Sequence, residues 1–88
     1  MKIRLYRSFK KSYKSRVASH KNLAQRTADR IALFKSDRLN LILKDHALSG
    51  AKREFRAFSI TGDIRIIYLP VSEDEVIFID IGTHNQVY

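Results

Sequence analysis

The spacing of apolar side chains predicts a strand and then a helix at the start of the chain. Residues 2–6 alternate isoleucine and leucine with charged or polar side chains, which is the period of a half-buried strand. Phe9, Tyr13 and Val17 then recur every four residues, with lysines and an arginine between them. Because Ser8 is a good N-cap residue, we expect an amphipathic helix from there to about residue 18, with one apolar and one cationic face.

A second helical repeat follows after a short polar break at residues 19–20. Apolar or small side chains recur at intervals of four, four and three from Leu23 to Phe34, so we expect this helix to end near residue 35. A break this short between two helices predicts an antiparallel hairpin. Further on, leucines and an isoleucine within residues 39–43 predict a helical turn against the core, and residues 45–50 predict a loop that ends in a turn.

The second half of the chain has the pattern of a three-stranded antiparallel meander. Residues 54–60 and 64–69 have the alternation of strands, and the Thr-Gly-Asp sequence between them is a turn signal, which predicts a hairpin. Pro70 is expected to end the second strand because it has no N–H to donate to a ladder. A polar turn at residues 72–74 and a β-branched run at residues 76–80 then give the third strand.

The last eight residues place many hydrogen-bonding side chains directly after the final predicted strand. Gly82 gives the backbone a place to turn, and we expect a polar loop that carries His84 and ends in the aromatic Tyr88. The complete order of elements predicts an α+β fold of a single domain, residues 1–88. An N-terminal strand and a two-helix hairpin are expected to pack on a mainly antiparallel sheet of four or five strands, with the first strand at an edge.

The amino-acid composition indicates the cellular compartment of the protein and bears on whether a partner stabilises it. The chain has no cysteine, which excludes disulfides and thiolate chemistry and suits a reducing cytoplasm. It has no apolar run long enough for a signal peptide or a membrane span, so we expect a cytoplasmic protein that does not associate with membranes. A core built from 88 residues gives only marginal stability, which favours a stabilising partner.

Basic residues are concentrated in the first half of the chain. The net charge is +8, from seventeen lysines and arginines against nine acids. Residues 1–38 hold twelve basic and two acidic residues, whereas residues 39–88 hold five and seven. Such a basic surface favours a polyanion such as RNA, or an acidic protein. The alternative is that these side chains only form solvated faces of the helices.

Three motifs of the second half occur together in one family of proteins. They are Asp45-His46-x-Leu48-x-Gly50, then Arg56 with Gly62-Asp63-x-Arg65-x-x-Tyr68, and finally Gly82-Thr83-His84-x-x-x-Tyr88. With the order strand, helix, helix and meander, this set resembles the RelE superfamily of bacterial type II toxins and, within it, the YafQ-like mRNA interferases. The resemblance covers nearly the whole chain. It implies a ribosome-dependent endoribonuclease that cuts mRNA in the ribosomal A site without a metal or cofactor and is silenced by a co-expressed antitoxin.

The resemblance also implies roles for individual residues. His46, Asp63 and His84 lie at the positions of catalytic side chains. Arg65 matches a phosphate-contacting arginine of the superfamily, and Tyr88 matches a terminal aromatic residue. We therefore expect His84 to act as general acid, with His46 or Asp63 as general base.

The chemistry of metal-free RNA cleavage is compatible with these residue types. The neighbouring 2′-hydroxyl attacks its own phosphate, which requires a base, an acid and a cation over the charged phosphorane. Histidines can make the proton transfers near neutral pH, because imidazole titrates there. We expect Arg56 and Arg65 to stabilise the phosphate and Lys52 to bind RNA. Tyr88 can stack a splayed base.

Several of these residues also fit structural roles. His46 fits a hydrogen-bonded loop anchor, and Asp63 fits a turn residue. Arg65 on a strand fits a cross-strand partner of Asp80 or Glu75. Sequence alone leaves these alternatives open.

Two positions depart from the YafQ-like pattern and keep a second function open. Ser59 stands where that pattern has a histidine, and Ile64 where it has a tryptophan, so a proton carrier and a stacking surface are missing. The alternative is a non-catalytic binding protein, either a ParE-like gyrase inhibitor or an inactive relative that binds only its antitoxin. In the enzymatic interpretation, the partners are mRNA in the A site, ribosomal RNA against the basic half, and an acidic antitoxin that folds on contact.

Overall fold

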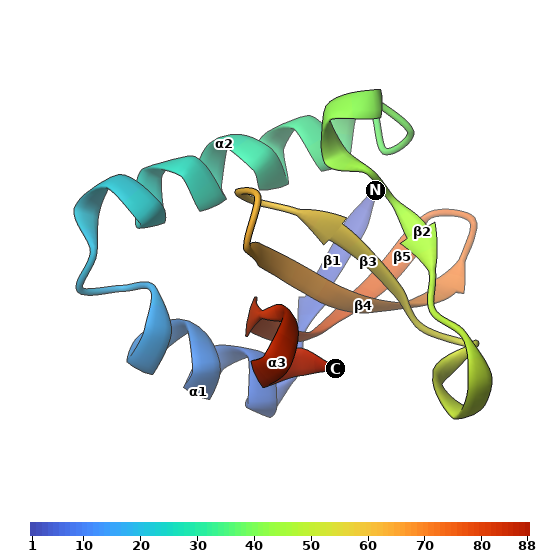
Figure 1. The fold of residues 1–88 in the computed structure, drawn as a ribbon. Coiled ribbons are helices and arrows are strands. Elements are labelled where there is room, and N and C mark those ends of the chain that lie inside the picture. The colour runs from blue at the N-terminus through green and yellow to red at the C-terminus, as the bar shows by residue number, and fades with distance from the viewer.

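The computed structural model describes residues 1–88, which form a five-stranded sheet with two long helices and a short C-terminal one (Figure 1). The strands are β1 (Lys2–Leu5), β2 (His46–Ala47), β3 (Arg56–Ser59), β4 (Ile64–Ser72) and β5 (Glu75–Thr83). The helices are α1 (Arg7–Arg16), α2 (Lys21–Ser36) and α3 (His84–Val87), and two 3₁₀ turns are η1 (Leu41–Leu43) and η2 (Gly50–Lys52). No helix has the length and apolar character needed to cross a membrane.

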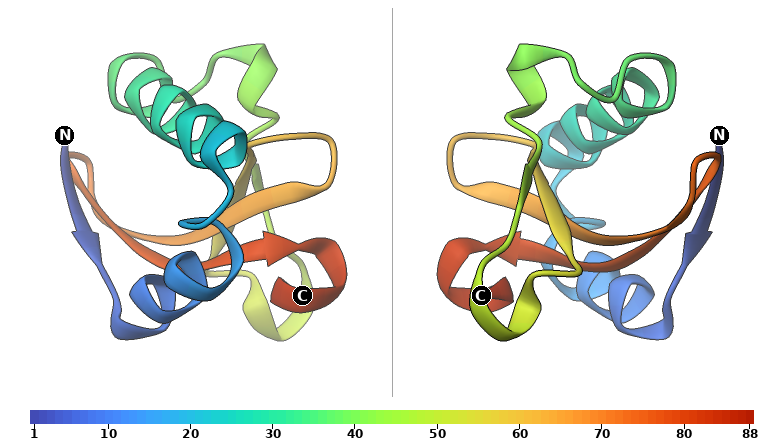
Figure 2. Two further views of the ribbon diagram at one scale, coloured as in Figure 1. Left: turned by 90° about the vertical axis from the view of Figure 1, so that its left-hand side faces the viewer. Right: turned by 90° about the vertical axis from the view of Figure 1, so that its right-hand side faces the viewer.

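The sheet has the strand order β1-β5-β4-β3-β2, with β1 parallel to β5 and every other pair antiparallel. The side views show a strongly curved sheet, with α2 above it, α1 at the lower corner near β1, and α3 at the opposite lower corner beside η2 (Figure 2). The predicted α+β fold is therefore confirmed, including the edge position of the first strand.

Both long helices cover the same face of the sheet. The chain runs toward the connecting turn along α1 and back from it along α2 (Figure 1). Phe9 of α1 and Phe34 of α2 both contact Phe78 of β5, with ring centroids 5.4 and 5.8 Å away. The sequence predicted Ser8 as the N-cap of α1, but Ser8 does not hold that position. Tyr6 holds that position, and the Ser8 hydroxyl donates instead to the carbonyl of Ile79.

The segment between α2 and β3 differs most from expectation. Of the apolar residues predicted to pack as a helical turn, only Leu43 is buried, whereas Leu41 is 92% exposed. The predicted loop contains β2, in which His46 pairs with Ala57 of β3. A strand of two residues is too short to show a period in the sequence, because alternation needs several positions.

The β3–β4 hairpin and the final strand are confirmed, but Pro70 does not end β4. The strand continues to Ser72, and Pro70 stands opposite Val76 of β5. The pairing of β3 with β4 stops at Tyr68, so from Leu69 onward β4 has only one neighbour. An edge of this kind tolerates a residue without an N–H.

Side-chain alternation divides the interior into two unequal clusters. The larger cluster lies under α1 and α2, and in it Phe34 stacks on Phe58 at 4.3 Å and meets Tyr68 edge-on at 4.9 Å. The smaller one lies on the other face, where Val87 of α3 packs with Ala57 and Ile67. This second cluster fixes α3 against the sheet and so sets the position of the C-terminal residues.

Candidate active site

An open cleft of about 370 Å³ brings together four of the residues that the sequence singled out. His46 comes from β2, Lys52 from η2, and His84 and Tyr88 from α3 and its end. Residues 47–49 complete the lining. The Lys52 ammonium donates to the main-chain oxygen of Tyr88 at 3.1 Å, which ties the η2 side of the cleft to the α3 side.

His46 has a defined orientation and protonation pattern. Its Nδ1 lies 2.9 Å from the carbonyl oxygen of Lys44, a residue in the left-handed region at φ 51°. Because a carbonyl only accepts, Nδ1 carries the proton, and in the neutral ring Nε2 is left as an acceptor. The ring is thus anchored through one nitrogen, as the structural interpretation expected. It is nevertheless exposed and faces the cleft, and its free nitrogen has the form of a base.

His84 and Tyr88 are held by a helical turn and not by the predicted loop. Thr83 is the N-cap of α3, and its N–H donates to Gln86 Oε1 at 2.8 Å within a capping box. One turn of helix places residues four apart on the same side. The His84 and Tyr88 rings accordingly meet edge to face, with centroids 4.4 Å apart.

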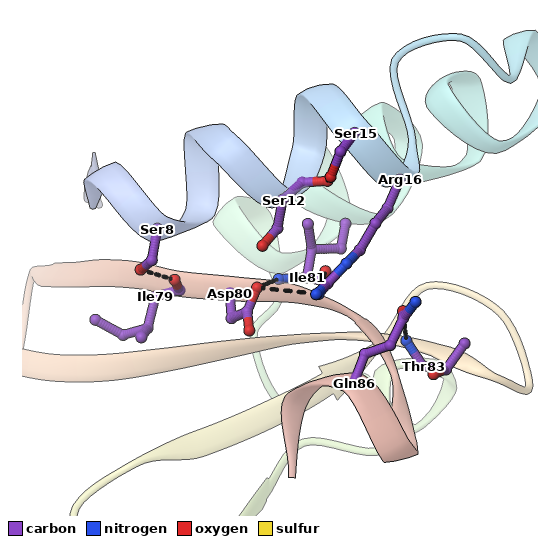
Figure 3. A network of polar contacts seen from close by, with 9 residues as sticks. All are labelled: Ser8, Ser12, Ser15, Arg16, Ile79, Asp80, Ile81, Thr83 and Gln86. Carbon is purple, nitrogen blue, oxygen red and sulfur yellow. Dashed lines mark hydrogen bonds and ion pairs between the residues drawn. The ribbon is translucent and has the colours of Figure 1, made fainter.

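Arg16 connects α1 to the strand that leads into this turn (Figure 3). Its Nη1 donates to the carbonyl of Ile81 at 2.9 Å and lies 3.4 Å from Asp80 Oδ1. Gly82 is part of β5 and makes no turn, contrary to prediction. A Cβ there would lie 2.6 Å from Gln86 Oε1 and 2.7 Å from Arg16 Nη1. A side chain at position 82 would therefore displace the ends of the Gln86 and Arg16 side chains. The role of Arg16 had no signal in the sequence beyond its basic charge near a helix end.

Arg65 lies beside Tyr88 but does not line the cleft itself. Its guanidinium carbon is 5.6 Å from the centre of the Tyr88 ring, and Nη2 donates to the Gly62 carbonyl at 3.4 Å. Its Nε is buried without a partner. The predicted cross-strand alternative is wrong, because Asp80 and Glu75 pair with Arg16 and Arg4. Arg65 thus keeps a positive charge free of any carboxylate at the edge of the site.

Arg56 has a structural position away from the cleft, and its surroundings do not support the prediction that it binds phosphate. It pairs with Tyr68 across the sheet, on the face under the helices, while Arg65 points to the opposite face. Its Nε and Nη2 each lie 2.7 Å from Asp45 Oδ1, and the Tyr68 hydroxyl donates to the same carboxylate. The Asp45 side chain is 2% exposed, so Arg56 neutralises a buried charge.

The pKa values of this trio follow from its burial. Desolvation raises the pKa of Tyr68 far above its ordinary value, and the hydrogen bond to Asp45 raises it further. Burial alone lowers the pKa of Arg56, but the contacts with Asp45 and Tyr68 outweigh it, so the pKa lies above its usual value. Tyr68 remains a neutral donor and Arg56 a cation at all ordinary pH values.

Asp63 is an exposed residue of the turn before β4 and does not line the cleft. Its own N–H donates to Thr61 Oγ1 at 3.2 Å, and its carboxylate makes no hydrogen bond or ion pair. Because β4 begins at Ile64, Asp63 lies in the turn and does not share a strand face with Arg65. Since Ile64 pairs with Thr83, the turn nevertheless ends beside the start of α3.

No three histidine, aspartate or glutamate side chains converge in a way that could hold a metal ion. The cleft offers two imidazoles, one ammonium and one aromatic ring. These groups can transfer protons, neutralise an anion and stack a base.

A family model described as "bacterial toxin of type II toxin-antitoxin system, YafQ" matches residues 1–88. The chain belongs to the YafQ toxin family. The resemblance seen in the motifs is thereby confirmed. No curated protein sequence matches the chain.

Solved structures of several bacterial toxins share the fold. YafQ from E. coli is 22% identical, with 98% of this chain and 96% of that one covered at a TM-score of 0.81. YafQ in the E. coli DinJ-YafQ complex is 23% identical over 98% and 96% of the two chains at 0.79. A copper-bound mutant toxin from Helicobacter pylori is 26% identical over 100% and 99% at 0.77. The similarity extends over essentially the whole fold in each case.

Proposed function

We propose that this chain is an mRNA interferase, a toxin that cuts mRNA in the ribosomal A site. The observation that carries the proposal is the meeting of His46 and His84, from opposite ends of the second half, in one cleft with Lys52 and Tyr88. A fold that only bound a partner would have no need for two imidazoles facing one open space.

In the proposed reaction, Nε2 of His46 takes the proton of the 2′-hydroxyl, and that oxygen attacks the neighbouring phosphorus. His84 gives a proton to the departing 5′-oxygen as its bond to phosphorus breaks. The products are a 2′,3′-cyclic phosphate and a 5′-hydroxyl, and no metal or cofactor takes part. The free Nε2 of His46 supports its assignment as base, while Asp63 lies outside the cleft lining.

The other groups of the site would bind and orient the RNA. Lys52 and Arg65 supply positive charge for the phosphorane, and Arg65 has no carboxylate to neutralise it. Tyr88 would stack a splayed base, as aromatic side chains do in single-strand recognition. Its ring is already oriented by His84 and Arg65.

We further propose three macromolecular contacts in the cytoplasm. The scissile strand is mRNA on the ribosome, and the basic residues of α1 and α2 contact ribosomal RNA, because a polyanion binds a surface of this charge. The third contact is with an acidic antitoxin. YafQ of E. coli has been solved in a toxin-antitoxin complex with DinJ, which supports the expectation of a comparable partner here.

Primer-extension mapping of a reporter mRNA on translating ribosomes tests the reaction. The protein is compared with His84→Ala, His46→Ala and a control, His20→Ala, whose exposed ring lies at the start of α2. We expect cuts in phase with codons, a loss of roughly 100-fold or more in each cleft variant, and no change in the control. Cleavage that persists when the scissile nucleotide carries 2′-deoxyribose would exclude the mechanism. A DNA-damage response without mRNA loss would favour gyrase inhibition instead.

A further inference from the structure

A second cleft, of about 450 Å³, lies between α2, η1 and the turn that joins β3 to β4. It shares no lining residue with the first cleft. Three cations line it, Arg26 and Arg30 from α2 and Lys44 from the end of η1. Leu41 and Ile42 form its apolar side. We refer to this group of five residues as the second cleft.

The positive charge of the second cleft is not neutralised within the protein. None of its three cations takes part in an ion pair, and no acidic residue lines it. The Arg30 guanidinium donates only to the carbonyls of Ile42 and Ser59, each at 3.3 Å. These bonds hold the guanidinium in place and leave its charge available to an anion.

The apolar side of the second cleft is unusually exposed. Leu41 is 92% exposed, and its neighbours Leu39 and Ile42 are 69% and 55% exposed. The turn η1, which carries these side chains, has a defined conformation. The Asn40 side chain accepts a hydrogen bond from the Ile42 N–H at 3.0 Å, and Lys44 closes the turn in the left-handed region. Exposed aliphatic groups that a structured turn holds in this way are typical of an interaction surface.

The chemistry of the second cleft fits a polypeptide better than single-stranded RNA. Proteins hold single-stranded RNA by stacking bases on aromatic side chains, and the second cleft has no aromatic residue. The candidate active site, in contrast, has Tyr88 and two histidines. Aliphatic side chains flanked by arginine and lysine instead match a segment that alternates acidic and aliphatic residues.

We propose that the second cleft docks an acidic, aliphatic segment of the antitoxin. Carboxylates of that segment would pair with Arg26, Arg30 and Lys44, and its aliphatic side chains would cover Leu41 and Ile42. The proposal rests on the antitoxin partner proposed above, and it adds the surface and the type of segment. It does not depend on RNA cleavage.

Fluorescence anisotropy with a synthetic peptide of alternating glutamate and leucine tests the docking surface. Leu41→Ser and the double variant Arg26→Gln/Lys44→Gln are each expected to weaken binding about tenfold, since one leucine burial or two desolvated charge pairs have this effect. The matched controls are Val71→Ser, another exposed apolar side chain, and Lys10→Gln/Lys11→Gln, which removes the same charge from α1. Both controls should bind as the wild type does.

Two further probes distinguish the docking of an acidic, aliphatic segment from simple charge attraction and from RNA binding. A polyglutamate peptide should bind about tenfold more weakly than the alternating one and should not respond to Leu41→Ser. An uncleavable 2′-O-methyl oligouridylate should lose no more affinity in Arg26→Gln/Lys44→Gln than in the Lys10/Lys11 control.

Three results would overturn the proposal: no saturable binding of the alternating peptide, equal losses in the cleft and control variants, or a selective loss of oligouridylate binding in the cleft variants. None of these measurements involves cleavage. Failure here therefore leaves the reaction to be decided by the His84 and His46 variants, and loss of the reaction leaves the docking result intact.

Discussion

Replacement of Arg56 by methionine should destabilise the fold without acting on RNA directly. The variant leaves the carboxylate of Asp45, which is 2% exposed, with only the Tyr68 hydroxyl as side-chain donor. Removal of one partner of a buried ion pair costs about 3–5 kcal/mol. Because Arg56 is 28% exposed and Tyr68 continues to donate, we expect about 2–3 kcal/mol here. This is a large part of the roughly 5–15 kcal/mol of a typical domain.

Urea unfolding followed by circular dichroism measures this loss. Addition of Asp45→Asn to Arg56→Met should recover at least about 1 kcal/mol, because no charge is then left buried. Arg65→Met is the matched control: this arginine has no ion pair, so its loss should change stability by less than about 1 kcal/mol and reduce RNA cleavage instead. If Arg56→Met kept its stability to within about 0.5 kcal/mol and lost cleavage as Arg65→Met does, the structural role argued for Arg56 would be refuted.

Two more predictions concern the C-terminal turn and the buried tyrosine. Gly82→Ala should displace the Gln86 and Arg16 side chains, lower the free energy of unfolding by about 1–2 kcal/mol and impair cleavage. In the control Gly62→Ala, nothing lies within 4 Å of the new methyl group, so the free energy of unfolding should change by less than about 0.5 kcal/mol. Urea unfolding of both variants measures the difference. The raised pKa of Tyr68 means that the folded state keeps a proton which the unfolded chain releases near pH 10, so its stabilising contribution is complete below pH 10 and falls by about 1.4 kcal/mol per pH unit above it. Tyr68→Phe should lack that part of the alkaline slope, and an unchanged slope would contradict the burial argument.

The long helices and strands could be predicted from the sequence because each is long enough to show a period. The helical repeats that contain Phe9 and Phe34 and the alternation along β4 each extend over several positions. The same alternation also predicts the face on which Arg56 lies. With the turn at residues 61–63 known, Arg56 and Tyr68 fall opposite one another, which places Arg56 on the helix-covered face.

The segments that form the cleft were harder to predict for physical reasons. The strand β2 has two residues and exists through its pairing with β3, a non-local interaction that no local pattern records. The turn α3 did have a local signal, since Thr83-x-x-Gln86 is a capping-box pattern. A loop was predicted there because the residues are polar and follow Gly82. Asp45 could not be identified as the partner of Arg56, because the approach of the two residues depends on the path of the chain between η1 and β2.

The cations from the two halves of the chain lie in different parts of the structure. The basic excess of the first half lies on α1 and α2, yet the cations at the candidate active site, Lys52 and Arg65, come from the half with more acids than bases. The cleft itself offers few cations to a long polyanion, namely Lys52 in its lining and Arg65 at its edge. A chain with this arrangement would obtain its affinity for large acidic partners from the helices and reserve the cleft for positioning one nucleotide. RNA affinity and chemistry would then depend on different residues, which is why removal of a helix lysine and removal of His84 should have separable effects.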